Sequence, residues 1–143
     1  MNQPEHHQHN IFKAEIVTPE GIFYAENVHM MVMPGVKGEF GVLVGHVASV
    51  VGLKSGLVTI YNQEMQVIER IFITTGFVEI TEQSAIILVE QAANLAEYNL
   101  SDSVKLLAKL NEDLNFCKND SEIGLVQKEI QEIESLIEIL KRL

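Results

Sequence analysis

Between Ile11 and about Ala92 the chain consists of short apolar runs, separated every few residues by glycine, proline, asparagine or a charged residue. In the first run, Phe12, Ala14 and Ile16 alternate with Lys13 and Glu15, which is typical of a strand with one buried face. The same signals predict further strands at 22–25, 28–33, 42–44, 57–61, 64–74, 77–80 and 85–90. Hairpin connections are expected around Asn62-Gln63 and Glu82-Gln83. This pattern predicts an antiparallel β sandwich or flattened barrel.

After Ala92 glycine nearly disappears and the apolar positions take a helical period. A first helix is predicted by the stripe Val104, Leu107, Leu110, Leu114 and Cys117, with Asn99 or Ser101 as its cap. A second helix is predicted by the heptad-like seam Ile123, Val126, Ile130, Ile133, Ile137 and Leu140. The short polar segment Lys118-Asn119-Asp120 makes the two helices an antiparallel hairpin. Leu125, Leu136, Ile139 and Leu143 lie off the seam, so we expect a further contact on this surface.

The chain therefore divides into three segments. Residues 1–10 are polar, contain His6, His7 and His9, and are expected to form a flexible tail. Residues 11–92 form the β-sandwich domain, and residues 93–143 form the helical hairpin domain. The predicted fold class is α+β in two units, since 143 residues suffice for one β domain and a small appendage.

Composition narrows the possible partners. The chain is 47% hydrophobic and 21% charged, which predicts a folded protein. A net charge of −10 without any cluster of Lys or Arg argues against nucleic acid. The sequence has neither a long apolar run nor a signal peptide, so membrane association is expected only through a partner. Cys117 is the single cysteine, which excludes an internal disulfide and is typical of the cytosol.

The sequence offers no recognisable catalytic or metal-binding set. Gly35, Gly38, Gly41 and Gly45 lack the Lys and Ser/Thr of a phosphate-binding loop, which favours a structural role at bends of the sheet. His29 and His46 have no partner at zinc-ligand spacing, so hydrogen-bonded structural histidines are expected. Two other functions stay open from the residues alone. They are an oligomeric scaffold, in which the helical seam self-associates, and a small-ligand-binding β-sandwich protein.

The segment Pro34-Gly35-Val36-Lys37-Gly38-Glu39-Phe40-Gly41-Val42-Leu43-Val44-Gly45-His46 resembles the signature of the epsilon subunit of the rotary, proton-translocating ATP synthase of bacteria. The resemblance extends to Val17-Thr18-Pro19-Glu20-Gly21 before the signature and to Gly76-Phe77-Val78-Glu79 after it. Ala48 and Thr75 depart from a proline and a glycine that are common in the family. The similarity covers most of 12–92, and the helical hairpin completes the family layout.

The resemblance implies a non-catalytic subunit of the central stalk, or rotor. It would couple the membrane ring of c subunits to the gamma shaft, as a peripheral protein on the cytoplasmic face of the bacterial inner membrane. In the family the glycine-rich segment lies at the end of the sandwich that rests on the ring. Glu39, Phe40 and His46 are therefore the candidate contacts with the ring or gamma.

The resemblance also implies a regulatory role for the hairpin. In the family a motif of the form [IL]-D-x-x-R-A binds ATP, and its counterpart here offers Asp102 and Lys105 as candidate nucleotide-binding residues. Lysine replaces the arginine, whose planar fork it does not reproduce. No other cofactor is expected. The second helix can reach the catalytic beta subunit in relatives and inhibit ATP hydrolysis, but here it is acidic, so we expect weaker inhibition.

Overall fold

A computed structural model describes residues 10–143, so the expected tail lies almost wholly outside the described residues. The chain divides into two compact units, the first ending at Leu95 and the second running Ala96–Leu143. The first unit contains the strands β1 (Phe12–Thr18), β2 (Gly21–Val28), β3 (Met30–Gly35), β4 (Gly38–Leu43), β5 (Ser49–Leu53), β6 (Gly56–Tyr61), β7 (Val67–Ile73), β8 (Gly76–Ile80), β9 (Ser84–Val89) and β10 (Ala92–Asn94). The short helix η1 (Leu95–Glu97) spans the boundary, and the second unit contains α2 (Leu100–Leu114) and α3 (Asp120–Arg142).

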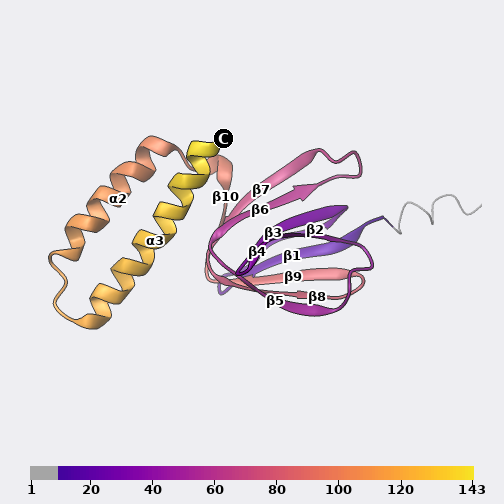
Figure 1. Cartoon of the computed structure of the whole chain (residues 1–143), viewed down its shortest axis with the longest axis horizontal. Coiled ribbons are helices and arrows are strands. Elements are labelled where there is room, and N and C mark those ends of the chain that lie inside the picture. Colours follow the sequence, from indigo (N-terminus) through magenta and orange to yellow (C-terminus); the bar gives the residue numbers. More distant parts are fainter. Residues whose placement is uncertain (1–9) are drawn as a thin grey trace, which may run out of the picture. The chain divides into compact units, whose positions relative to one another are not determined.

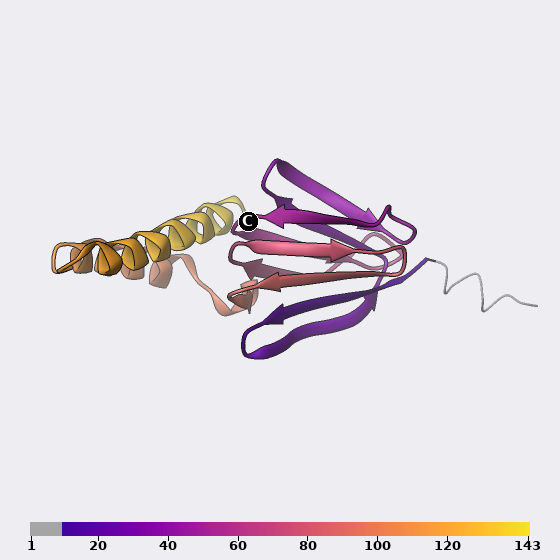
Figure 2. The ribbon, with the colours of Figure 1, turned by 90° about the horizontal axis from the view of Figure 1, so that it is seen from below.

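The strands form one sheet in the order β10-β7-β6-β3-β5-β8-β9-β1-β2, with β4 paired to β3. The sheet folds over itself into two layers, as the ribbons in Figures 1 and 2 show. The layers join where β3 meets β5 at the single pair Gly35 and Leu53. Both expected hairpins, β6–β7 and β8–β9, are present. The sandwich prediction is confirmed, although β1 and β9 pair in parallel rather than antiparallel.

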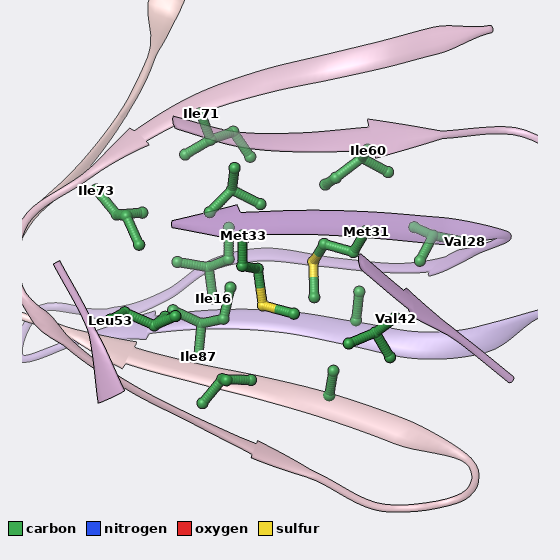
Figure 3. Close-up of a cluster of buried hydrophobic side chains, with 14 of the residues drawn as sticks. Ile16, Val28, Met31, Met33, Val42, Leu53, Ile60, Ile71, Ile73 and Ile87 are labelled. Atoms are coloured by element: carbon green, nitrogen blue, oxygen red, sulfur yellow. The ribbon is translucent and has the colours of Figure 1, made fainter. Parts of the chain in front are cut away.

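The core lies between the two layers and is almost entirely aliphatic. In β1, β6 and β9 alternate residues point inward, so Phe12, Ala14 and Ile16 are buried as the pattern predicted. Figure 3 shows Met31 and Met33 among the isoleucine and valine side chains of both layers. Every buried side-chain nitrogen or oxygen in residues 10–143 has a hydrogen-bond partner. The result is a stiff, close-packed body.

Two strands were not expected from the sequence. In β5 only Leu53 is buried, and Gly52 interrupts its apolar side chains, so the segment carries little alternation. β10 spans three half-buried residues, Ala92–Asn94, at the point where the helical composition begins. Both strands are defined by their pairing with β8 and β7 rather than by their own pattern.

In the second unit α2 and α3 form the expected hairpin. Asn99 caps α2 by accepting from the Asp102 backbone N–H at 2.8 Å. Asn119 caps α3 in the same way, and the Glu122 carboxylate accepts from the Lys118 backbone N–H at 2.7 Å. The side chains of Asn119 and Glu122 thus fix the predicted connection at the start of α3.

The helix stripes follow the predicted seams with one difference. All six seam positions of α3 are half-buried or buried, with Ile137 the most buried. On α2 Val104 is exposed, and Ser103 takes the inward position instead. Its hydroxyl donates to the Asn99 carbonyl oxygen at 2.9 Å, so this polar side chain is buried in the first turn of α2 with its hydrogen bond made. Leu136, predicted to lie off the seam, is buried, whereas Leu125 is exposed.

Candidate partner-binding surfaces

The glycine-rich segment forms a tight hairpin between β3 and β4. Gly35 pairs with Gly38, and a Cβ on Gly35 would lie 2.6 Å from the Gly38 carbonyl oxygen. Gly38 has φ +133°, which side chains rarely adopt. The Val36 N–H donates to Gly52 O at 3.0 Å, and the turn is therefore fixed to the neighbouring strand β5. Its glycines serve the bend, as the sequence predicted, and the segment continues as a strand.

The turn displays a small mixed surface. Val36 is 60% exposed, and Lys37 and Glu39 are also exposed. Phe40 is half-buried and packs against the core beneath them. Of the first two predicted contact residues, only Glu39 is therefore fully available to a partner, and Phe40 supports the turn from inside.

His46, the third predicted contact residue, lies beyond the opposite end of β4. It follows Gly45, whose N–H donates to Glu82 O at 2.9 Å and so joins this loop to the β8–β9 turn. The imidazole Nδ1 is bonded to Val47 O at 2.9 Å and the residue is half-buried. His29 is bonded likewise to Asn10 O at 2.9 Å, so the prediction of hydrogen-bonded histidines is confirmed. The structure does not bring Glu39 and His46 together.

A larger surface, which the sequence reasoning missed, crosses the outer face of one layer. We call it the outer row, and it consists of Val17, Ile22, Phe77 and Leu88. The strand register places Phe77 opposite Leu88, Leu88 opposite Val17, and Val17 opposite Ile22. Ile22 is 63% exposed, Phe77 46% and Leu88 38%.

The outer row continues onto the glycine-rich turn. Gly52 is the register partner of Phe77 in β5, and the Val36 side chain lies over it, within 3.5 Å of where a Cβ would stand. Aligned apolar side chains thus extend from β2 to the β3–β4 turn. Contiguous exposed apolar surfaces are typical of sites that bind other proteins, membranes or ligands.

One signal in the sequence pointed to this surface. An antiparallel strand with a solvated outer face alternates apolar and polar residues, whereas Ile86, Ile87, Leu88 and Val89 are all apolar. A continuous apolar run in such a strand indicates that both faces are covered. The core covers Ile87 and Val89, whereas Leu88 stays partly exposed on the outer face.

Burial, with smaller effects of Glu69 and Glu26, raises the pKa of Tyr24 on β2. In the described part of the chain, no three His, Cys, Asp or Glu side chains are grouped as metal ligands. The histidines at positions 6, 7 and 9 lie outside it. Neither helix is both long and apolar enough to cross a membrane, within residues 10–143.

The candidate nucleotide-binding residues lie on the first turn of α2. Asp102 and Lys105 are both exposed, and the Asp102 backbone N–H is occupied by the Asn99 cap. On α3 the guanidinium of Arg142 is paired with Glu138 of the same helix at 3.1 Å. Nucleotide binding by Asp102 and Lys105 stays a prediction.

Comparison with known proteins identifies the family. Residues 11–95 match the model of the ATP synthase Delta/Epsilon chain β-sandwich domain. The chain is 34% identical over 128 residues to the ATP synthase epsilon chain of Helicobacter pylori (strain HPAG1), covering 88% of this chain and 98% of that protein. It is 32% identical over 131 residues to the epsilon chain of Hydrogenobaculum sp. (strain Y04AAS1), covering 92% and 94%.

A solved structure shares the fold. A chain of the Euglena gracilis mitochondrial ATP synthase (OSCP/F1/c-ring) matches with a TM-score of 0.75 at 18% identity, covering 92% of this chain and 82% of that one. The family model spans nearly the whole sandwich, and the bacterial relatives align along almost their entire length. The chain therefore belongs to the family of ATP synthase epsilon chains.

Proposed function

We propose that the chain is a non-catalytic rotor subunit of a bacterial proton-translocating ATP synthase, which couples the ring of c subunits to the gamma shaft. A coupling element must be stiff and must present two contact surfaces. The sandwich meets the first need through its close-packed aliphatic core. The outer row and the β3–β4 turn meet the second, and the outer row is the observation that carries the proposal.

The outer row is the proposed gamma site. Burying exposed apolar area contributes about 25 cal/mol per Å², and aromatic and aliphatic side chains at the centre of an interface carry most of its binding energy. Phe77 and Leu88 occupy the centre of the row and Ile22 its margin. A long-lived contact with the shaft is expected on such a surface, rather than on the charged turn.

The β3–β4 turn is the proposed ring site. Lys37 and Glu39 offer both signs of charge on a backbone fixed by its bonds to β5. Charged groups at an interface fix register and exclude wrong partners more than they add affinity, which suits a contact with a ring of repeated subunits. Because His46 lies beyond the other end of β4, we propose that it contacts a different subunit from the one that Glu39 contacts.

The hairpin is proposed to regulate ATP hydrolysis only weakly. α3 carries Glu122, Glu129, Glu132, Glu134 and Glu138 against Lys128, Lys141 and Arg142. Arg142 is already paired within the helix. Repulsion would weaken its contact with an acidic segment of the catalytic beta subunit. Removal of residues 94–143 should raise ATPase activity of the assembled enzyme only slightly, and a many-fold rise would contradict this part of the proposal.

The test is binding to gamma. The purified full chain should be monomeric by light scattering and should bind the α3β3γ complex tightly. Leu88→Asp places a charge in the outer row without touching the core, so binding should be lost while the melting temperature is retained. Glu64→Gln, in the exposed β6–β7 loop, is the control and should bind like the wild type. A chain that dimerises and ignores α3β3γ would support the scaffold alternative instead.

In this proposal the membrane is reached only through the ring, on the cytoplasmic face of the inner membrane. Washed membranes stripped of the catalytic head and central stalk should regain ATP-driven proton pumping when α3β3γ and the full chain are added together. Membranes that received α3β3γ alone are the control. Equal pumping with and without the chain would contradict a coupling role.

A further inference from the structure

An open hollow of about 370 Å³ adjoins the outer row at the end of the sandwich that carries the β1–β2 and β7–β8 turns. It is lined by Val17, Thr18, Pro19, Thr75, Gly76, Phe77, Leu88, Val89 and Glu90. Phe77, Leu88 and Val17 belong to both the hollow and the outer row. The hollow is therefore continuous with the proposed gamma surface.

The walls of the hollow are fixed before any partner arrives. On one side the Thr18 hydroxyl accepts from the Glu20 backbone N–H at 3.2 Å, which holds the β1–β2 turn closed. On the other side the Thr74 hydroxyl accepts from the Gln91 N–H at 3.0 Å, and the Thr74 N–H donates to Gln91 O at 3.1 Å. These bonds tie the β7–β8 turn to the segment after β9. A preformed hollow costs a partner little ordering free energy on binding.

The lining indicates the chemistry of the occupant. It is mainly apolar, and Glu90 is the one charged residue within it. Glu20 lies in the adjoining turn and adds a second negative charge at the surface. A free small molecule usually needs about 70–90% of its surface enclosed, which an open hollow does not provide. A side chain carried by a protein partner has no such need.

We propose that this hollow receives one bulky apolar side chain of gamma, flanked by a lysine or arginine that pairs with Glu90. The inference rests on the proposed function and adds the anchor that sets register on the outer row. Buried anchors in preformed pockets dominate interface affinity. The flanking cation accelerates association and gives it a salt dependence.

Filling the hollow tests the anchor. Thr75 is an exposed wall residue, and Thr75→Trp would occupy the space with indole. Its matched control is Gln63→Trp, which adds the same side chain to the exposed β6–β7 loop. With full-length protein and α3β3γ, Thr75→Trp should weaken Kd at least about tenfold, the effect expected for losing an interface hot spot. Gln63→Trp should match the wild type.

Reversing the charge tests the cation. Glu90→Lys should slow association and flatten its dependence on salt, whereas Glu64→Lys, with the same change of net charge, should leave the salt dependence unaltered. Pro19→Trp, which adds indole to the hollow from the exposed β1–β2 turn, serves as a second anchor variant if Thr75→Trp lowers the melting temperature.

The outcomes separate the two levels of inference. Wild-type affinity in Thr75→Trp and Pro19→Trp overturns the anchor but leaves the gamma contact intact. A wild-type chain that does not bind α3β3γ refutes the proposed function itself. A wild-type dimer that Thr75→Trp converts to monomer identifies a second copy as the occupant and overturns the anchor on gamma.

Discussion

Gly76 is the first residue of β8, which lies between β5 and β9. A substitution at Gly76 measures how closely the backbones of β8 and β9 approach each other. It pairs with Leu53 of β5 on one side and with Val89 of β9 on the other. A Cβ at Gly76 would lie 2.0 Å from Leu88 O and 2.8 Å from Val89 Cγ1, whereas real Cβ contacts stay beyond 3.0 Å. Gly76→Ala must therefore move β8 away from β9 by about 1 Å.

The cost follows from that displacement. Overpacking of a close contact costs about 1–3 kcal/mol, and a weakened ladder hydrogen bond adds about 1 kcal/mol. We expect Gly76→Ala to lower the free energy of unfolding by about 2–4 kcal/mol, a large share of the 5–15 kcal/mol typical of a domain. For a domain of this size the melting temperature should fall by about 10 °C or more.

Calorimetry of the full chain measures this effect, with Gly41→Ala as the matched control. A Cβ at Gly41 would meet the end of the flexible Met30 side chain, at 2.6 Å, and otherwise nothing closer than 3.7 Å. Met30 can turn aside, so this variant should cost less than about 1 kcal/mol. The reasoning fails if Gly76→Ala melts within about 2 °C of the wild type, or if the two variants are equally destabilised.

Three further predictions concern the hairpin. Asn99→Ala removes the α2 cap and should destabilise the hairpin by about 1 kcal/mol, measured by helical circular dichroism in urea; Asn99→Ser should restore most of it. Gly124→Ala, at an α3 position where a Cβ meets nothing within 4 Å, should stabilise the hairpin by about 1 kcal/mol, and a loss would show a hidden contact. Burial raises the pKa of Glu132 above 4.5, although Lys128 opposes the shift. The folded hairpin therefore holds this proton more tightly, and the resulting stability is present below pH 4.5 and is lost as the pH rises through the raised pKa. Glu132→Gln should reduce this decline in urea titrations at successive pH values, and an unchanged decline would contradict the assignment.

Most of the fold could be read from local pattern. Alternation in Phe12–Thr18 placed Ile16 in the core, and the three-and-four spacing of α3 placed Ile137 on the seam. Val104 was misplaced because spacing alone does not show that Ser103 can bond back to Asn99 and so turn inward. The strands β5 and β10 were not predicted, because each is defined by pairing with a strand that is distant in the sequence.

The candidate surfaces were harder to predict from local sequence pattern than the fold. The motif grouped Glu39 and His46 because they are close in sequence, but an extended strand separates its two ends in space. The outer row joins residues from β1, β2, β8 and β9, and only the register brings them into line. The apolar run 86–89 was the one local sequence signal that indicated the outer row.

The parallel pairing of β1 with β9 bears on how the chain acquires its structure during synthesis. Ala14 lies beside Ala85, about 70 positions later, and contacts that remote form slowly because a large loop must close first. The β1–β2 hairpin is made early, yet the other edge of β1 stays unpaired until β9 has left the ribosome. A nascent chain arrested before Ser84 should thus be a target for holding chaperones, and one released after Val89 should no longer need them.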